Sequence, residues 1–184
     1  MNNKTMVRVR DYIPSIRTDL KYATADNFLH RPFYEINEAY LRYGTVRKLA
    51  VVQEKLASFR LGLKIWDAWR DPKAQFLMWE LMPDDRYIAD PRKGFSKHSR
   101  GNTVDVTLIR LTDGEELEMP SCFDDFTDRA NRDYSKASAE AAKNARLLEQ
   151  TMKEAGFTAY FDEWWHYPDE DVYEVVYQIE EETM

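Results

Sequence analysis

Two short stretches decide the fold of this chain: SKHSRGNTVD, residues 96–105, and EWWH, residues 163–166. The chain has three histidines, and two of them, His98 and His166, lie in these stretches. Each of the two has a carboxylate a few residues away along the chain. We therefore expect the two stretches to fold together into one catalytic metal site. The rest of the chain would form its frame and its substrate pocket.

The four candidate groups of this site are His98, Asp105, Glu163 and His166. A catalytic zinc ion takes three protein ligands and keeps a fourth position open. We assign His98, Asp105 and His166 to one Zn²⁺ per chain. Glu163 is then left as general base, because zinc-bound water has a pKa of about 7 and still needs a carboxylate to take its proton. A non-haem iron site is the alternative, but this ligand set suits hydrolysis better than redox chemistry.

The spacing within each stretch places demands on the backbone. Gly101 would allow a tight turn between His98 and Asp105. Residues three apart on an extended strand point to opposite faces, so Glu163 and His166 need a bend between them to face one metal. The two tryptophans between them could pack on either side and exclude water.

Hydrophobic patterns predict a mixture of helices and strands outside the two stretches. Apolar residues recur with helical period over 45–61 and 138–155, and a proline opens a third helical segment over 72–81. Alternation or β-branched residues indicate strands over 63–69 and 103–109. Further predicted segments are a strand over 157–167, a closing strand or short helix over 172–179, and irregular chain over 7–43, 84–95 and 110–136.

Length and composition narrow the class of protein. With 184 residues the chain is expected to form one domain, and it contains no apolar run of about 18 residues that could span a membrane. The net charge of −7 argues against nucleic acid as a partner. A single cysteine, Cys122, excludes an intramolecular disulfide. The N-terminus lacks a signal-peptide pattern, so we expect a cytoplasmic protein, or a periplasmic one if a leader was removed.

The two stretches resemble the motifs of a known enzyme family. Residues 96–105 match S-x-H-x-x-G-x-A-x-D of the zinc-dependent D-alanyl-D-alanine dipeptidases of the VanX type, except for one position, and residues 163–167 resemble their E-x-W-H motif. Segments 20–28, 31–34, 69–72 and 123–126 are also similar to the family and follow its order, so the resemblance covers about residues 8–180.

This resemblance implies an α+β domain over residues 1–184, with a central antiparallel sheet flanked by helices, of the Hedgehog/DD-peptidase type. The implied reaction is hydrolysis of D-alanyl-D-alanine to two D-alanines by zinc-bound water. By the same resemblance, Arg70 would stabilise the oxyanion, a role that suits its fixed cationic fork. Asp124 would bind the free amine of the dipeptide, and Tyr22 and Ser96 would line the pocket.

Three departures from the family pattern concern the surroundings of the site. Thr103 replaces the alanine of the first motif, and Asp71 separates Arg70 from Pro72, where it could pair with the arginine. Residues 119–122 contain a proline where a glycine-containing segment is expected.

Two other functions stay open at this point. One is a zinc peptidase that acts on murein stem peptides, and the other is a zinc-containing binding protein without turnover. The presence of Glu163 argues against the second. The expected partner is a small dipeptide, a homo-oligomer is a further option, and His30 is expected to be a surface or packing histidine.

Overall fold

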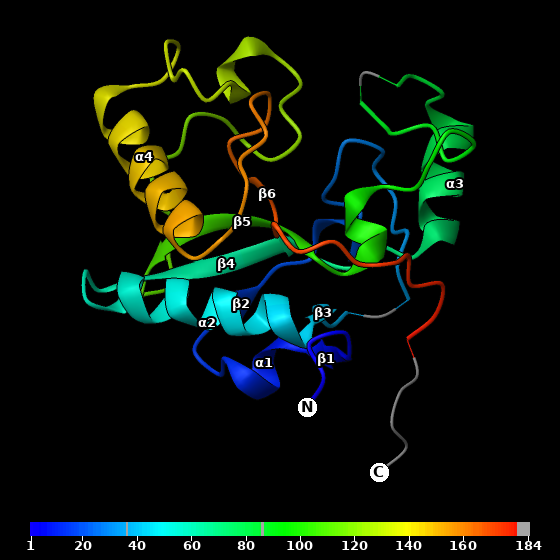
Figure 1. Ribbon diagram of the computed structural model, residues 1–184. Coiled ribbons are helices and arrows are strands. Elements are labelled where there is room, and N and C mark those ends of the chain that lie inside the picture. Colours follow the sequence, from blue (N-terminus) through cyan, green and yellow to red (C-terminus); the bar gives the residue numbers. More distant parts are fainter. Residues whose placement is uncertain (36, 86, 180–184) are drawn as a thin grey trace.

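A four-stranded sheet forms the centre of the fold (Figure 1). The structure is a computed structural model that describes residues 1–35, 37–85 and 87–179. The strands follow the order β2-β4-β5-β6, and all pairs are antiparallel except the parallel pair of β2 and β4. The predicted α+β fold is confirmed, with β2 as a parallel edge strand. The bounds are β2, Arg17–Thr18; β4, Leu61–Asp67; β5, Thr103–Arg110; and β6, His166–Pro168.

The N-terminal segment, predicted to be irregular, contains several very short elements. Strands β1 (Met6–Arg8) and β3 (Tyr40–Arg42) pair antiparallel in a separate two-stranded sheet. Between them lie the single turns α1 (Val9–Tyr12) and η1 (Lys21–Ala23). Elements of three or four residues are too short to establish a hydrophobic period, so the sequence pattern could not reveal them.

Three longer helices lie close to the predicted positions: α2 (Tyr43–Ala57), α3 (Pro72–Leu81) and α4 (Ala139–Glu154). The side chain of Asp71 caps α3 by accepting a hydrogen bond from the Lys73 amide at 2.8 Å, and Pro72 follows it. Helix α2 begins two residues before the predicted start at residue 45, because Tyr43 and Gly44 already have helical geometry.

The prediction of a strand over 157–167 is wrong for most of its length. Strand β6 begins only at His166, and the residues before it form turns. They do not form a regular ladder with β5, since the Trp164 amide donates to the carbonyl of Ala130, outside the sheet, at 3.1 Å. Residues 172–179 form neither a strand nor a helix.

One hydrophobic core joins α2 and α4 to the sheet. Of the apolar face predicted for α2, Val46, Leu49, Val52 and Leu56 are fully buried, whereas Phe59 lies beyond the end of α2 and is exposed. Figure 1 shows α2 running along β4 and β2. No helix in the described part of the chain is both long and apolar enough to pass through a bilayer. Core side chains that are no more than 1% exposed include Leu49, Val52, Leu56, Leu63, Ile65, Val106, Leu108, Leu148 and Met152.

Strand β5 separates the core from the site. Side chains alternate between the two faces of a strand, so Val104, Val106 and Leu108 share one face, and Asp105 and Thr107 share the other. In the β4–β5 ladder Ile65 pairs with Val106 but Asp67 pairs with Asp105, which leaves one extra residue, a β-bulge, on β4. The bulge places Asp67 directly beside Asp105.

Candidate metal and substrate site

Three side chains from separate elements converge at the centre of the site. His98 comes from the short helix η2 (Lys97–Arg100), Asp105 from β5 and His166 from β6, and one ligand atom of each lies within 4.8 Å of the others. His98 Nε2 is 3.3 Å from His166 Nδ1 and 3.4 Å from Asp105 Oδ2. His166 Nδ1 is 2.9 Å from Asp105 Oδ1. Two imidazole nitrogens and a carboxylate form a donor set that fits Zn²⁺.

The sheet itself brings two of these groups together. Asp105 and His166 are direct partners in the β5–β6 ladder, and Asp67 is the partner of Asp105 on the other side. Directly opposite residues in an antiparallel pair have neighbouring side chains. Asp67, Asp105 and His166 therefore form one row across three strands.

A backbone carbonyl orients the imidazole ring of His98. Its Nδ1 lies 2.7 Å from the carbonyl oxygen of Ala68, which only accepts hydrogen bonds, so Nδ1 carries the proton and Nε2 is available to a metal. Gly101 ends η2 with a φ of 71°, as expected for a tight turn. The positive φ favours glycine, and a Cβ at this position would lie 2.6 Å from the sulfur of Met6, so the end of that side chain would have to shift.

Glu163 lies beside the cluster because the chain bends. The His166 amide donates to the Glu163 carbonyl at 3.2 Å, which closes a turn and confirms the predicted bend. Glu163 Oε2 is 3.6 Å from His166 Nδ1. Burial raises the pKa of Glu163, although His166 opposes this change. Burial acts to raise the pKa of Asp105 too, but the two histidines hold it well below its usual range.

These opposite shifts separate two roles that neighbouring carboxylates can take. Asp105 stays ionised between two imidazoles, as a metal ligand must. Glu163, with the higher affinity for a proton, is the better proton carrier.

Arg70 is held next to the cluster by Asp67. Its Nε and Nη2 lie 3.2 and 2.7 Å from Asp67 Oδ2, and the guanidinium lies 4.8 Å from the ring centre of Tyr22. Asp67 is fully buried and also accepts a hydrogen bond from the Tyr34 hydroxyl at 2.8 Å. Asp71, which the sequence suggested as a partner of Arg70, caps α3 instead.

The loop that contains Asp124 reaches over the same space. Asp124 Oδ2 accepts a hydrogen bond from the Tyr22 hydroxyl at 2.8 Å, and burial raises the pKa of Asp124 well above its usual value. Asp124 has a φ of 55°, a left-handed conformation that is costly for a residue with a side chain and is found often at functional sites. Ser96 Oγ accepts from the His98 amide at 3.3 Å.

All eight residues predicted for the site line one cavity of about 300 Å³. This volume is at the lower end of small-molecule sites, which span about 300–1,000 Å³. Thr103, which replaces the alanine of the family motif, is fully buried, and its hydroxyl has no partner among the described residues. The aromatic part of the cavity wall consists of Tyr22, Tyr87, Phe95, Phe126, Tyr160 and Trp165.

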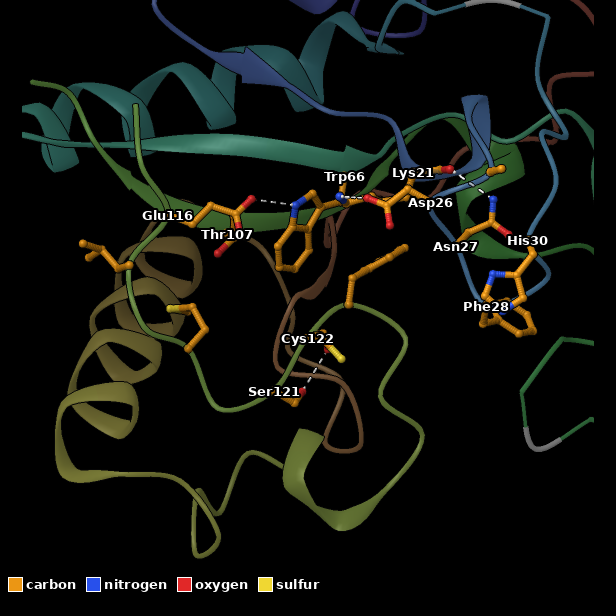
Figure 2. Close-up of a pocket in the computed structure, with 14 residues that line it drawn as sticks. Lys21, Asp26, Asn27, Phe28, His30, Trp66, Thr107, Glu116, Ser121 and Cys122 are labelled. Carbon is orange, nitrogen blue, oxygen red and sulfur yellow. Dashed lines mark hydrogen bonds and ion pairs between the residues drawn. The ribbon is translucent and has the colours of Figure 1, made fainter. Parts of the chain in front are cut away.

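A second cavity, of about 420 Å³, lies further along the sheet and shares no lining residue with the first (Figure 2). Figure 2 shows Trp66, whose indole nitrogen donates to Glu116 at 3.2 Å, between the two ends of this space. Cys122 and His30 line this cavity and are both exposed. The exposed position of His30 agrees with the surface role expected for it.

Sequence reasoning missed three residues next to the site: Asp67, Tyr34 and Arg132. A signal existed for Asp67, which is an acid between the apolar residues Trp66 and Ala68 of a predicted strand. Tyr34 lies in an irregular segment, and nothing in its pattern distinguishes it from other surface tyrosines. Arg132 lies in the long loop after β5, yet its guanidinium donates to the Glu163 and His166 carbonyls.

A cluster of two histidines and one aspartate, with a carboxylate and an arginine beside it, is typical of the active site of a hydrolytic enzyme. The chain belongs to the D-ala-D-ala dipeptidase family, whose model matches residues 2–181. It is therefore an enzyme, a dipeptidase.

Individual relatives support this family assignment. The chain is 34% identical to a D-alanyl-D-alanine dipeptidase of Enterococcus faecium over 176 residues, covering 85% of this chain and 87% of that protein. It is also 34% identical to proteins of the same name in Escherichia coli (84% and 79% covered) and Streptomyces coelicolor (86% and 88% covered).

Proposed function

We propose that the chain hydrolyses free D-alanyl-D-alanine to two D-alanines, with one zinc ion held by His98, Asp105 and His166. The main support is the convergence of the three ligand atoms within 4.8 Å in a small cavity that Glu163 and Arg70 also line. The names of the relatives supply the substrate. Zinc in this position supplies a Lewis acid and makes water acidic enough to attack at neutral pH.

Glu163 is the proton carrier in this proposal. Its carboxylate takes a proton from the attacking water as the new C–O bond forms at the scissile carbonyl. It then gives this proton to the leaving nitrogen as the C–N bond breaks, so the two products are an acid and a free amine. The raised pKa of Glu163 suits both steps, because the group must accept the proton and release it again.

Arg70 stabilises the negative charge that develops on the carbonyl oxygen. Asp67 fixes two of its donor nitrogens, and the guanidinium keeps other N–H groups for the reacting oxygen. A preorganised donor does not need to reorient during the reaction, which is the source of its effect.

Asp124 is proposed to bind the free ammonium group of the dipeptide. Burial raises the pKa of this carboxyl even though the charge of Arg70 opposes the shift, and an ammonium group beside it would add compensating positive charge. Tyr22 orients this carboxylate, and Ser96 also lines the cavity. An N-acylated dipeptide has no such cation and should bind poorly.

The alternative substrate, a murein stem peptide, has less support. Such a peptide extends beyond the reactive dipeptide and needs an open groove, whereas this cavity measures about 300 Å³ and has aromatic walls.

The test compares hydrolysis of D-Ala-D-Ala, N-acetyl-D-Ala-D-Ala, L-Ala-L-Ala and a stem pentapeptide, with and without a chelator. We expect chelator-sensitive cleavage of the free D,D-dipeptide alone, loss of it in Glu163→Gln, and little change in Asp162→Asn, which alters the neighbouring exposed carboxylate. Faster cleavage of the pentapeptide would favour the alternative substrate. Bound zinc without cleavage of any compound would contradict the proposed reaction.

A further inference from the structure

Arg132 makes an unusual set of contacts at the base of the site. Its side chain is only 5% exposed although it is charged. Its Nε donates to the Tyr160 carbonyl at 2.6 Å, and its Nη2 donates to the carbonyls of Glu163 and His166, both at 3.0 Å. Its Nη1 donates to the Tyr167 hydroxyl at 2.9 Å. One guanidinium therefore binds four points along an eight-residue segment, at both ends of the turn.

Backbone contacts also hold this segment before β6 begins: the Trp164 amide donates to the Ala130 carbonyl, and the Trp165 carbonyl accepts from the Val106 amide, both at 3.1 Å. Residues 158–165 have neither helix nor strand geometry. The turn itself is closed by a single backbone bond, from the His166 amide to the Glu163 carbonyl at 3.2 Å. Arg132 Nη2 donates to the backbone carbonyls of both Glu163 and His166, so it bridges the two ends of the turn that carries these side chains.

Arg132 is itself anchored to the rest of the fold. Its Nη1 lies 3.6 Å from Glu149 of α4, and its guanidinium lies 4.4 Å from the ring centre of Tyr167. Its own amide donates to the Phe161 carbonyl at 2.9 Å, so its main chain and side chain bind the same turn. Lysine cannot replace this arrangement, since a single ammonium group lacks the planar fork that reaches several carbonyls at fixed angles.

We propose that Arg132 is a positioning residue that sets the relative placement of Glu163 and His166, and so controls both turnover and metal affinity. This inference rests on the roles proposed above for these two residues. Arg132 touches neither the reacting atoms nor the metal position, and it acts through the turn that it holds. Groups that orient metal ligands typically contribute about 10–100-fold to metal affinity or activity.

The experiment compares Arg132→Lys with the parent chain and with Val52→Ala. Val52 is fully buried in α2, so its truncation lowers stability without contact to the site and serves as a control for stability alone. The measurements are the melting temperature, kcat and KM for D-Ala-D-Ala, and the zinc dissociation constant from competition with a chromophoric chelator.

We expect Arg132→Lys to lower kcat and to weaken zinc binding by about 10-fold or more, with a smaller change in KM. Val52→Ala should lower the melting temperature and leave kcat and zinc affinity unchanged. In Arg132→Ala, guanidinium added at roughly a few millimolar should restore part of the lost kcat. This concentration is far below the denaturing range of several molar. Methylammonium at the same concentration should not restore kcat.

A kcat and a zinc affinity of Arg132→Lys equal to those of the parent would overturn the inference, provided that Glu163→Gln is inactive in the same assay. An active Glu163→Gln would overturn the proposed function as well, so the two failures can be distinguished. Loss of folding in both Arg132 variants would also overturn the inference, because Arg132 would then be a requirement of the fold.

Discussion

The substitution Asp67→Asn tests how Arg70 is held. Nε and Nη2 of Arg70 both donate to Asp67 Oδ2. Asp67 Oδ1 accepts from the Tyr34 hydroxyl at 2.8 Å and from the Ala68 amide at 3.0 Å. Asparagine has one acceptor oxygen and one donor nitrogen. Whichever way its amide turns, the nitrogen faces groups that donate, so one side of this network is lost.

The expected cost follows from the burial of the ion pair. The side chains of Asp67 and Arg70 are 0% and 13% exposed, so water cannot replace the lost partner. Breaking a buried ion pair costs about 3–5 kcal/mol of folding free energy. In a chain of this length each kcal/mol lowers the melting temperature by about 2–4 °C, which gives a decrease of about 6–20 °C. Misplacement of Arg70 should also lower kcat by about 10–100-fold.

The assay is urea unfolding at pH 7, followed by the fluorescence of the buried tryptophans, together with initial rates of D-alanine release. The matched control is Asp113→Asn, which breaks an Arg–Asp pair with the same three-residue spacing and both side chains nearly half exposed. This control should keep the urea midpoint of the parent. An Asp67→Asn chain with the midpoint of the control, or with an unchanged kcat, would refute the role given to Asp67.

Three other predictions concern pH, the turn after His98 and the metal. Burial raises the pKa of Tyr167 to about 12, against about 10 in an unfolded chain, so the stability that it contributes is complete below pH 10 and is lost as pH rises to about 12. When pH rises from about 9 to about 11, the free energy of unfolding of Tyr167→Phe, measured in urea, should therefore fall by about 1.4 kcal/mol less than that of the parent. An equal fall in both proteins would contradict this. Gly101→Ala should lower the free energy of unfolding by at least about 1 kcal/mol and weaken zinc binding. The reason is that alanine at a φ of 71° is strained and its Cβ meets the side chain of Met6. An unchanged zinc affinity would show that the turn does not control the position of His98. Zinc at about 100 times its dissociation constant should add about 2.7 kcal/mol to the free energy of unfolding, so a chelator should lower the melting temperature by about 5–11 °C. In His166→Ala, which lacks one proposed ligand, the chelator should leave the melting temperature unchanged.

The parts of the fold that the sequence predicts well depend on local physics. Helices α3 and α4 have cap residues next to a helical pattern, and strand β5 is rich in β-branched residues. All eight residues proposed for the site line one cavity, because their spacing matched motifs in which the order along the chain reflects a fixed geometry. The roles of these residues stay predictions that the proposed experiments test.

The segment before β6 could not be predicted from local pattern. Residues 157–167 are aromatic and read as a strand, but the chain must bend between Glu163 and His166 for both to reach one site. The bend is stabilised from outside the segment, by Arg132 and by the Ala130 carbonyl. A long-range contact of this kind outweighs strand propensity. The three-residue spacing of Glu163 and His166 indicated the bend, but not the residues that hold it.

The bulge in β4 explains why the alternation of the strand did not reveal Asp67 as a residue of the site. Regular alternation would put Asp67 on the same face as Leu63 and Ile65, which face the apolar core, and a carboxylate there would be buried without partners. The extra residue at Trp66 shifts the register, so that Asp67 pairs with Asp105 and faces the site. The bulge thus converts a costly buried charge into the acceptor that holds Arg70. Alternation along a strand predicts which face a side chain occupies only where the pairing is regular. The face of Asp67 cannot be predicted in this way, because Asp67 follows the bulge.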